Sequence, residues 1–290
     1  MQRERVADDI YIFTSDLYAQ VTAGVVLTAE GAVLIDTLLF PEETRAIKHF
    51  VEGRLACPVR YVINTHYHAD HTYGTYMFPD ATVISHALCY DLLNTRGRDG
   101  LEQARQEMSE LKSVQLALPM LVFNHRPLIL RLGNKTLHMW HTPGHSPDCS
   151  VVLVKEDRVL FGADTLMPIP YFVDGSYDDF LASLQSLQNN TFECIVQGHG
   201  EVILRGEIEE KIQSDIKYLT LLKKYATNAH TKSDPEAYLA RVDVERCGKS
   251  RILLSGQVQQ LHVANLRMMY KQVGGNIQAP EPTAENSGDK

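Results

Sequence analysis

Short apolar runs, each followed by a turn rich in glycine, proline or polar residues, recur over the first two thirds of the chain. Four of these runs lead into a turn that carries histidine or aspartate: 59–64, 136–140, 158–161 and 192–196. Brief β-branched and apolar runs bounded by turn-forming residues predict buried strands. Because strand ends are rigid supports for loops that carry chemistry, we expect the functional residues in these four turns.

The pattern of apolar runs is repeated once within the chain. In each copy an apolar run, five residues and a second apolar run lead to an Asp-Thr pair; the copies are 25–37 and 151–165. A stretch with helical periodicity and another strand follow each copy. The first helix is expected near Pro41, and the second after Ser176-x-x-Asp179, which resembles a capping box. Two such halves predict two sheets packed face to face, with helices on the outer surfaces.

The last third of the chain has helical periodicity. Apolar residues recur every three or four positions from Ile208 to Leu222, the capping signature Ser233-Asp-Pro-Glu236 predicts a second helix, and 258–273 predicts a third. We expect a β-rich domain over 1–205, a helical extension over 206–277 and a disordered tail over 278–290. The extension either packs on the β-rich domain or forms the face of a homodimer.

Metal-binding residue types are concentrated directly after the run at 59–64. The segment His66-x-His68-x-Asp70-His71 places three imidazoles and a carboxylate within six residues. Two residues apart in extended chain, His66 and His68 point to the same side. Asp70 and His71 lie beyond the bend and can face a second ion. Imidazole nitrogen and carboxylate oxygen are ligands for zinc, iron and manganese. A solvated polar loop is the alternative, but this density of histidine favours a metal site.

Three further turns supply single candidates of the same kind. His145 ends a Pro-Gly-His turn, Asp164 follows Gly-Ala, and His199 lies in Gly-His-Gly. Each alone is a weak signal, because aspartate and histidine are common in turns. Their occurrence after the first motif makes all three candidate ligands.

The order His-x-His-x-Asp-His, Pro-Gly-His, Gly-x-Asp-Thr, Gly-His-Gly resembles the metallo-β-lactamase superfamily from about Ile10 to Val202. The resemblance implies an αββα sandwich, here with a C-terminal helical extension, and a catalytic domain over 1–205. It also implies two metal sites that share one carboxylate. Their implied ligands are His66, His68 and His145 for one ion, Asp70, His71 and His199 for the other, and Asp164 bridging both.

The implied bridging aspartate is generally absent from the zinc β-lactamases. With this aspartate present, the chain resembles the glyoxalase II-type thioesterases, acyl-homoserine lactonases and phosphodiesterases of the superfamily. We therefore predict a metal-dependent hydrolase that uses a hydroxide bridging two divalent ions on a small ester, lactone or thioester. Zn²⁺ is the first choice, with Fe or Mn as alternatives. Asp70, a ligand with a free oxygen, is the predicted proton shuttle. The alternatives are an iron-dependent oxidoreductase of the same fold, a phosphodiesterase or a β-lactamase.

Composition and net charge restrict the expected binding partners and cellular compartment of the protein. A net charge of −8 without a basic cluster argues against a nucleic-acid partner. No apolar run spans a bilayer, and the five scattered cysteines are expected to be reduced. We expect a cytoplasmic enzyme that takes a small-molecule substrate and does not bind membranes.

Three features outside the ligand set could shape the site. The segment 88–123 ends in the run 116–123, which is unusually apolar for a connection. The segment could form a lid, although ordinary packing explains it almost as well. Tyr67, Tyr73 and Tyr171 could donate to an oxyanion. Asp36 occupies in the first copy the position of Asp164 in the second, either orienting a metal-bearing loop or forming a turn.

Overall fold

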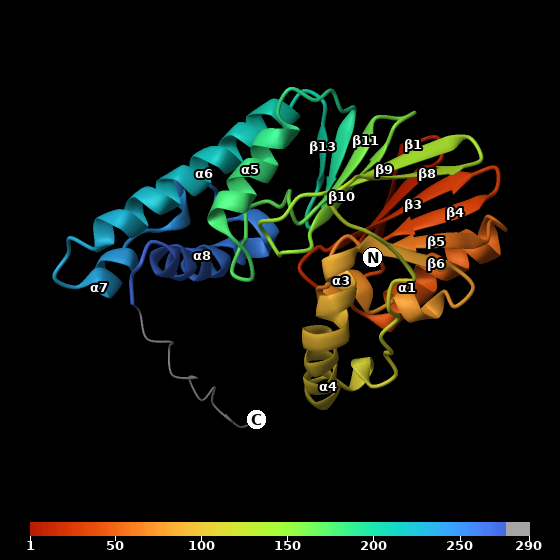
Figure 1. The fold of residues 1–290 in the computed structure, drawn as a ribbon, viewed down its shortest axis with the longest axis horizontal. Helices are drawn as coiled ribbons and strands as arrows, with labels where there is room; N and C mark the ends of the chain where they lie inside the picture. The colour runs from red at the N-terminus through yellow and green to blue at the C-terminus, as the bar shows by residue number, and fades with distance from the viewer. Residues whose placement is uncertain (277–290) are drawn as a thin grey trace.

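Two β-sheets pack face to face, with helices on both outer surfaces and more helices at one end, in the computed structural model (Figure 1). It describes residues 1–276, so the expected disordered tail lies outside the described residues. The first sheet contains β1 (Gln2–Ala7), β2 (Ile10–Thr14), β3 (Thr22–Thr28), β4 (Gly31–Ile35), β5 (Val59–Ile63), β6 (Thr82–His86) and β7 (Leu121–Phe123). The second contains β8 (Leu128–Leu132), β9 (Lys135–His141), β10 (Ser150–Val154), β11 (Val159–Ala163), β12 (Cys194–Gln197) and β13 (Val202–Leu204).

Helices fill the connections and the C-terminal third. The α-helices are α1 (Pro41–Lys48), α2 (Ala69–Thr72), α3 (Ala87–Leu92), α4 (Arg98–Glu107), α5 (Tyr177–Leu187), α6 (Ile208–Ala229), α7 (Pro235–Leu239) and α8 (Val258–Gln272). Wider π-helical turns follow α1 and α3, at His49–Arg54 and Leu93–Gly97. Short 3₁₀ turns lie at Thr75–Met77, Ser109–Leu111, Val244–Cys247 and Leu253–Gly256. None of the helices within residues 1–276 is long and apolar enough to cross a membrane.

Both sheets contain the same unit. In the first sheet β3 and β4 are antiparallel, α1 crosses over, and β5 pairs parallel to β4. In the second sheet β10 and β11 are antiparallel, α5 crosses over, and β12 pairs parallel to β11. The repeat predicted from the apolar pattern is therefore confirmed. The predicted αββα sandwich of two mixed sheets with C-terminal helices is confirmed as well.

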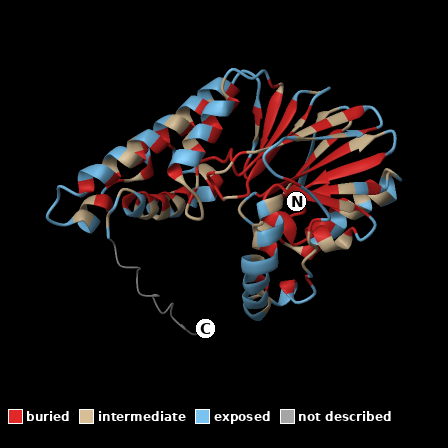
Figure 2. Ribbon diagram, viewed as in Figure 1, coloured by how far each residue is buried: buried red, intermediate tan, exposed pale blue. Residues whose placement is uncertain are grey.

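The core consists of three apolar layers. Between the sheets lie side chains of both, among them Ile63, Phe161 and Val196, each at most 3% exposed. Outside the first sheet, Ile47 of α1 is fully buried. Outside the second sheet, Phe180 of α5 belongs to a cluster that continues into α6 and α8. Figure 2 shows this burial concentrated in the strands, while the free sides of the outer helices are exposed. The C-terminal helices thus share a core with the second sheet.

The segment from α3 to α4 projects from the lower edge of the first sheet as drawn in Figure 1. Its apolar side chains form a small separate cluster centred on Leu101, Leu111 and Val114. This cluster also contains Tyr73, and Ala69 packs against it. The predicted lid is therefore partly a packing element, which rests on the segment that carries Asp70.

Candidate metal centre

The seven predicted ligands come from the ends of four strands. His66 and His68 lie in the loop after β5, and Asp70 and His71 lie in the short helix α2 that follows it. The other three ligands follow β9, β11 and β12: His145, Asp164 and His199. The chain turns sharply at these points, and Ala163 has a φ of +44° directly before Asp164. The fold brings all seven side chains together at one edge of the sandwich.

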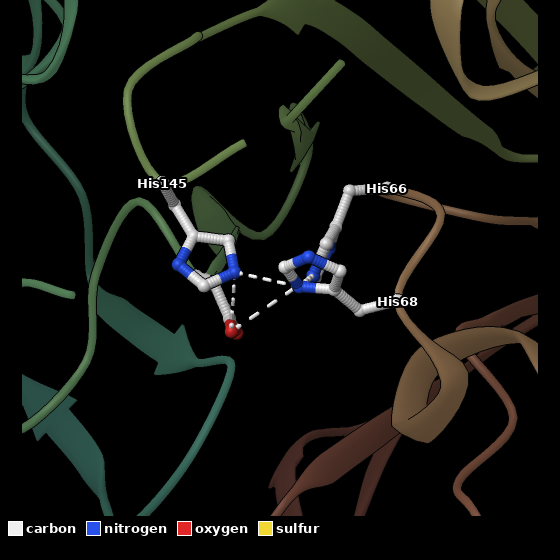
Figure 3. Close-up of side chains that lie close together, drawn as sticks. His66, His68 and His145 are labelled. Atoms are coloured by element: carbon white, nitrogen blue, oxygen red, sulfur yellow. Dashed lines mark hydrogen bonds and ion pairs between the residues drawn. The ribbon is translucent and has the colours of Figure 1, made fainter. Parts of the chain in front are cut away.

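The side chains form two groups. In the first group, ligand-type atoms of His66, His68, His145 and Asp164 all lie within 4.8 Å of one another, and in the second, those of Asp70, His71 and His199 do. Figure 3 shows the imidazoles of the first group converging. Nε2 of His145 lies 2.9 Å from Nδ1 of His68. These groups coincide with the two ligand sets that the resemblance implied.

Asp164 lies between the two groups. Its Oδ2 is 3.2 Å from Nε2 of His145 and 3.5 Å from Nε2 of His199, and its Oδ1 is 3.3 Å from Nε2 of His71. A Cβ atom at Gly198 would lie 1.9 Å from Oδ1 of Asp164, so this carboxylate can occupy its position only beside a glycine. A side chain that touches both groups is the arrangement a bridging ligand requires.

Asp36 supports the centre from behind. Its Oδ2 lies 2.9 Å from Nδ1 of His71 and accepts the Thr65 hydroxyl at 2.7 Å. Its Oδ1 accepts the Thr65 backbone N–H at 2.9 Å. Asp36 thus fixes both the ring of His71 and the loop that begins the first motif. Of the two interpretations left open by the sequence, the geometry favours the orienting one.

Backbone carbonyls orient two more histidines. Nδ1 of His145 lies 2.7 Å from the Tyr171 carbonyl oxygen, and Nδ1 of His199 lies 2.9 Å from that of Ala19. A ring that donates from Nδ1 to a carbonyl keeps Nε2 as a lone-pair donor. Both Nε2 atoms face Asp164. These carbonyls therefore favour the tautomer that leaves Nε2 free for a metal ion.

The residues present fit divalent cations. Among the described residues, Nε2 of His71 and Oδ1 of Asp164 are buried polar atoms without a hydrogen-bond partner, and both face the centre. Buried polar groups without a partner are rare in proteins. A metal ion between the groups would satisfy both atoms with the nitrogen and oxygen donors that zinc accepts.

Charge supports the same conclusion. Despite burial, the carboxylates of Asp164, Asp70 and Asp36 raise the pKa of His71 well above its usual range. Burial also opposes ionisation of Asp70, but His71 and His199 hold its pKa at about 2. Carboxylates crowded into a buried centre need positive charge next to them, which protons on histidine provide when metal does not. The centre is therefore a strong attractor of cations.

Tyr18 lies in a loop next to this centre, since the carbonyl oxygen of the following residue, Ala19, is 2.9 Å from Nδ1 of His199. It was not among the residues predicted from the sequence. Its loop joins β2 to β3 and is anchored by the Ser15 hydroxyl, which accepts the Tyr18 backbone N–H at 3.0 Å. The nearby Asp70 carboxylate, together with burial, raises the pKa of Tyr18 to about 12, so Tyr18 remains a hydroxyl donor. The side chain is 42% exposed and therefore open to a substrate. In the sequence, Tyr18 stands out only as part of the apolar pair Leu17-Tyr18 in a turn.

The three tyrosines predicted as oxyanion donors have different surroundings. The Tyr67 hydroxyl donates to Oδ2 of Asp174 at 2.7 Å. Tyr73 is only 4% exposed and packs in the cluster of the inserted helices. The Tyr171 ring lies beside His145, with centroids 6.1 Å apart. Because Tyr67 is committed to a carboxylate and Tyr73 is buried, Tyr18 and Tyr171 are the better candidates.

The chain is similar in sequence to proteins of one large family. The model of the metallo-beta-lactamase superfamily matches residues 18–206. A lactamase-like protein, aptB, of Emericella nidulans is 26% identical over 66% of this chain and 54% of its own length. An atrochrysone carboxyl ACP thioesterase of Claviceps purpurea is 22% identical over 66% of this chain and 54% of its own length. The chain thus spans about half the length of most of the curated relatives it matches.

Solved structures show the same fold. A metallo-beta-lactamase from Pontibacter korlensis superposes with a TM-score of 0.59 and 21% identity, covering 73% of this chain and 98% of its own. The sec-alkylsulfatase Pisa1 from Pseudomonas sp. superposes with a TM-score of 0.74 and 16% identity, covering 94% of this chain and 50% of its own. With the family model matching well over half of the residues, the chain belongs to the metallo-beta-lactamase superfamily.

Proposed function

We propose that this protein is a dinuclear metallohydrolase that cleaves a small ester, lactone or thioester. The position of Asp164 between two histidine-containing groups is the observation that carries the proposal. A single structural metal would need four ligands, whereas this centre supplies seven. In the proposal, His66, His68 and His145 would hold one ion, Asp70, His71 and His199 would hold the other, and Asp164 would be shared by both.

In the proposed reaction, Asp164 and Tyr18 have separate roles. Two bound divalent ions, with zinc the first choice, would lower the pKa of water and polarise the substrate's carbonyl oxygen. Asp164 would hold the two halves of the centre at a fixed separation. Tyr18, whose hydroxyl keeps its proton, can donate to the oxygen that gains negative charge.

Asp70 is the proposed proton carrier. Its Oδ2 lies 3.3 Å from Nε2 of His199 and 3.8 Å from Nε2 of His71. Its side chain is 14% exposed, whereas that of Asp164 is 3% exposed. A carboxylate that ligates with one oxygen and has solvent access can accept a proton from water and deliver it to the leaving group.

The proposed substrate class follows from the relatives and from the charge of the chain. Relatives described as acyl carrier protein thioesterases favour an acyl substrate. The net charge of −8 disfavours polyanions such as nucleic acid. A second candidate is a sulfate ester, because the likeness to the alkylsulfatase extends over 94% of the chain and so includes C-terminal helices.

A substrate panel with metal analysis tests the proposal. Protein purified without added metal would be assayed for zinc, iron and manganese, then tested on thioesters, lactones, esters, sulfate esters, phosphodiesters and β-lactams. Two equivalents of zinc with hydrolysis of carbonyl substrates is the expected result. Coloured iron with oxygen consumption would instead identify an oxidoreductase, and a protein that binds no metal would contradict the proposal.

A further inference from the structure

Asp174 connects three parts of the molecule that are far apart in sequence. It lies in the loop before α5, on the second half of the sandwich. Its Oδ2 accepts the Tyr67 hydroxyl at 2.7 Å and lies 3.5 Å from Nε2 of His68. Its Oδ1 accepts a hydrogen bond from Nη1 of Arg96 at 2.9 Å. One carboxylate thus contacts both the metal-binding loop and the inserted helices.

His68 depends on such a contact more than the other histidines of its group. It faces the centre through Nδ1, which lies 3.1 Å from Nε2 of His66, so its Nε2 points away from the centre. Its side chain is 25% exposed, whereas those of His66 and His145 are at most 3% exposed. A partly exposed imidazole has more rotational freedom than a packed one, and an outer carboxylate fixes its orientation.

Arg96 belongs to the π-helical turn Leu93–Gly97, between α3 and α4. The inserted helices otherwise rest on the first half of the molecule, through the cluster around Leu101 and Leu111. The ion pair between Arg96 and Asp174 therefore connects the inserted helices to the second half of the sandwich as well, through the loop before α5. The Arg96 side chain is 59% exposed, so this link is solvated and can open at modest energetic cost.

We propose that Asp174 is a positioning residue that couples closure of the inserted helices to the orientation of His68. Closing the helices brings Arg96 onto Oδ1 and holds the carboxylate against His68, whereas releasing Arg96 leaves Asp174 and the ring freer to rotate. The inference rests on the proposed function in one respect, that His68 is a metal ligand. It adds a link between metal affinity and the insertion.

The test measures Zn²⁺ affinity by chelator competition, together with amide hydrogen exchange of residues 93–107. Asp174→Ala should weaken Zn²⁺ binding about tenfold or more, as removal of outer carboxylates does, and should also accelerate exchange in the insertion. Arg96→Gln should accelerate exchange and lower Zn²⁺ affinity by less than Asp174→Ala does. Asp174→Asn, which keeps the shape and an acceptor oxygen, should fall between wild type and Asp174→Ala in affinity.

Matched controls separate coupling from general damage. Asp178→Ala removes a carboxylate four residues away whose side chain is 85% exposed, and Arg98→Gln removes an arginine whose Nε donates to Oδ1 of Asn94. Neither should change Zn²⁺ affinity, and Asp178→Ala should leave exchange of residues 93–107 unchanged. Melting temperatures of the metal-free variants show whether each remains folded; if Asp174→Ala does not fold, Asp174→Asn decides.

Two results would overturn the inference. Wild-type Zn²⁺ affinity in Asp174→Ala would show that His68 needs no positioning, and unchanged exchange in both Asp174→Ala and Arg96→Gln would show that no coupling exists. Failure of the proposed function has a different signature, because wild-type protein would then bind no Zn²⁺ or hydrolyse none of the panel.

Discussion

In each half of the sandwich, the second strand of the repeated unit (β4 or β11) leads directly into an aspartate. The two aspartates, however, have different contacts. After β4, Asp36 turns behind the centre, where it accepts hydrogen bonds from Thr65 and contacts Nδ1 of His71. After β11, Asp164 faces the centre itself. The strand pattern therefore specifies where a carboxylate lies, whereas the neighbouring loops decide whether it touches the ion or the ligand behind it.

The backbone accounts for part of this difference. Asp36 itself has a φ of +57°, whereas in the second half Ala163 has a φ of +44° and Asp164 follows it. The left-handed residue is thus displaced by one position between the halves. Gly198, directly after β12, gives Asp164 room, whereas the residue directly after β5, near Asp36, is Asn64. Similar sequences therefore place their carboxylates at opposite nitrogens of the His71 ring.

The largest effect should come from Asp164. Asp164→Ala removes the carboxylate that contacts both groups, so metal content should fall by about half or more, with turnover reduced beyond the ~100-fold typical of outer residues. Metal analysis and steady-state rates on the same preparation check this. Full metal content with an unchanged rate would rule out a shared ligand.

Asp70→Asn should reduce turnover by about 100-fold or more while metal content changes less. The amide keeps an oxygen ligand but loses the ability to accept a proton. Zn²⁺ titration beside rate measurements separates the two roles. If affinity and rate fall in proportion, Asp70 is a ligand without a proton-transfer role.

Asp36→Asn should have a smaller effect on chemistry than either change above. The amide retains one acceptor for Thr65 but weakens the contact to Nδ1 of His71, so Zn²⁺ affinity should fall about 10- to 100-fold, the range for outer partners. Chelator competition measures this affinity. A loss equal to that of Asp164→Ala would show that the two aspartates are equivalent after all.

The sequence predicted the contacts that depend on local pattern. The four ligand-bearing turns, the repeated unit and the helix after Ser176 follow from apolar spacing and turn chemistry, and the sheets place them as expected. Asp174 and Tyr18 were missed because their roles depend on distant loops meeting: Asp174 contacts residues 107 and 78 positions away. No periodicity along the chain encodes such an encounter, since tertiary packing decides it.

The crossover helices of the two halves, α1 and α5, begin differently. Ser176 caps α5 by accepting the Asp179 N–H at 3.3 Å, whereas α1 begins after Phe40 with no side-chain cap and uses Pro41 to fix its first turn. Ser176→Ala should therefore cost about 1 kcal/mol, a fall in melting temperature of roughly 2–4 °C. Ser186→Ala is the matched control, because that hydroxyl only donates to the Ser183 carbonyl within the same helix and alanine favours helix. Thermal unfolding of metal-free protein measures both variants. Equal melting temperatures for the two would mean that α5, like α1, is held by its buried face, with Phe180 packed against Gly144, and not by its cap.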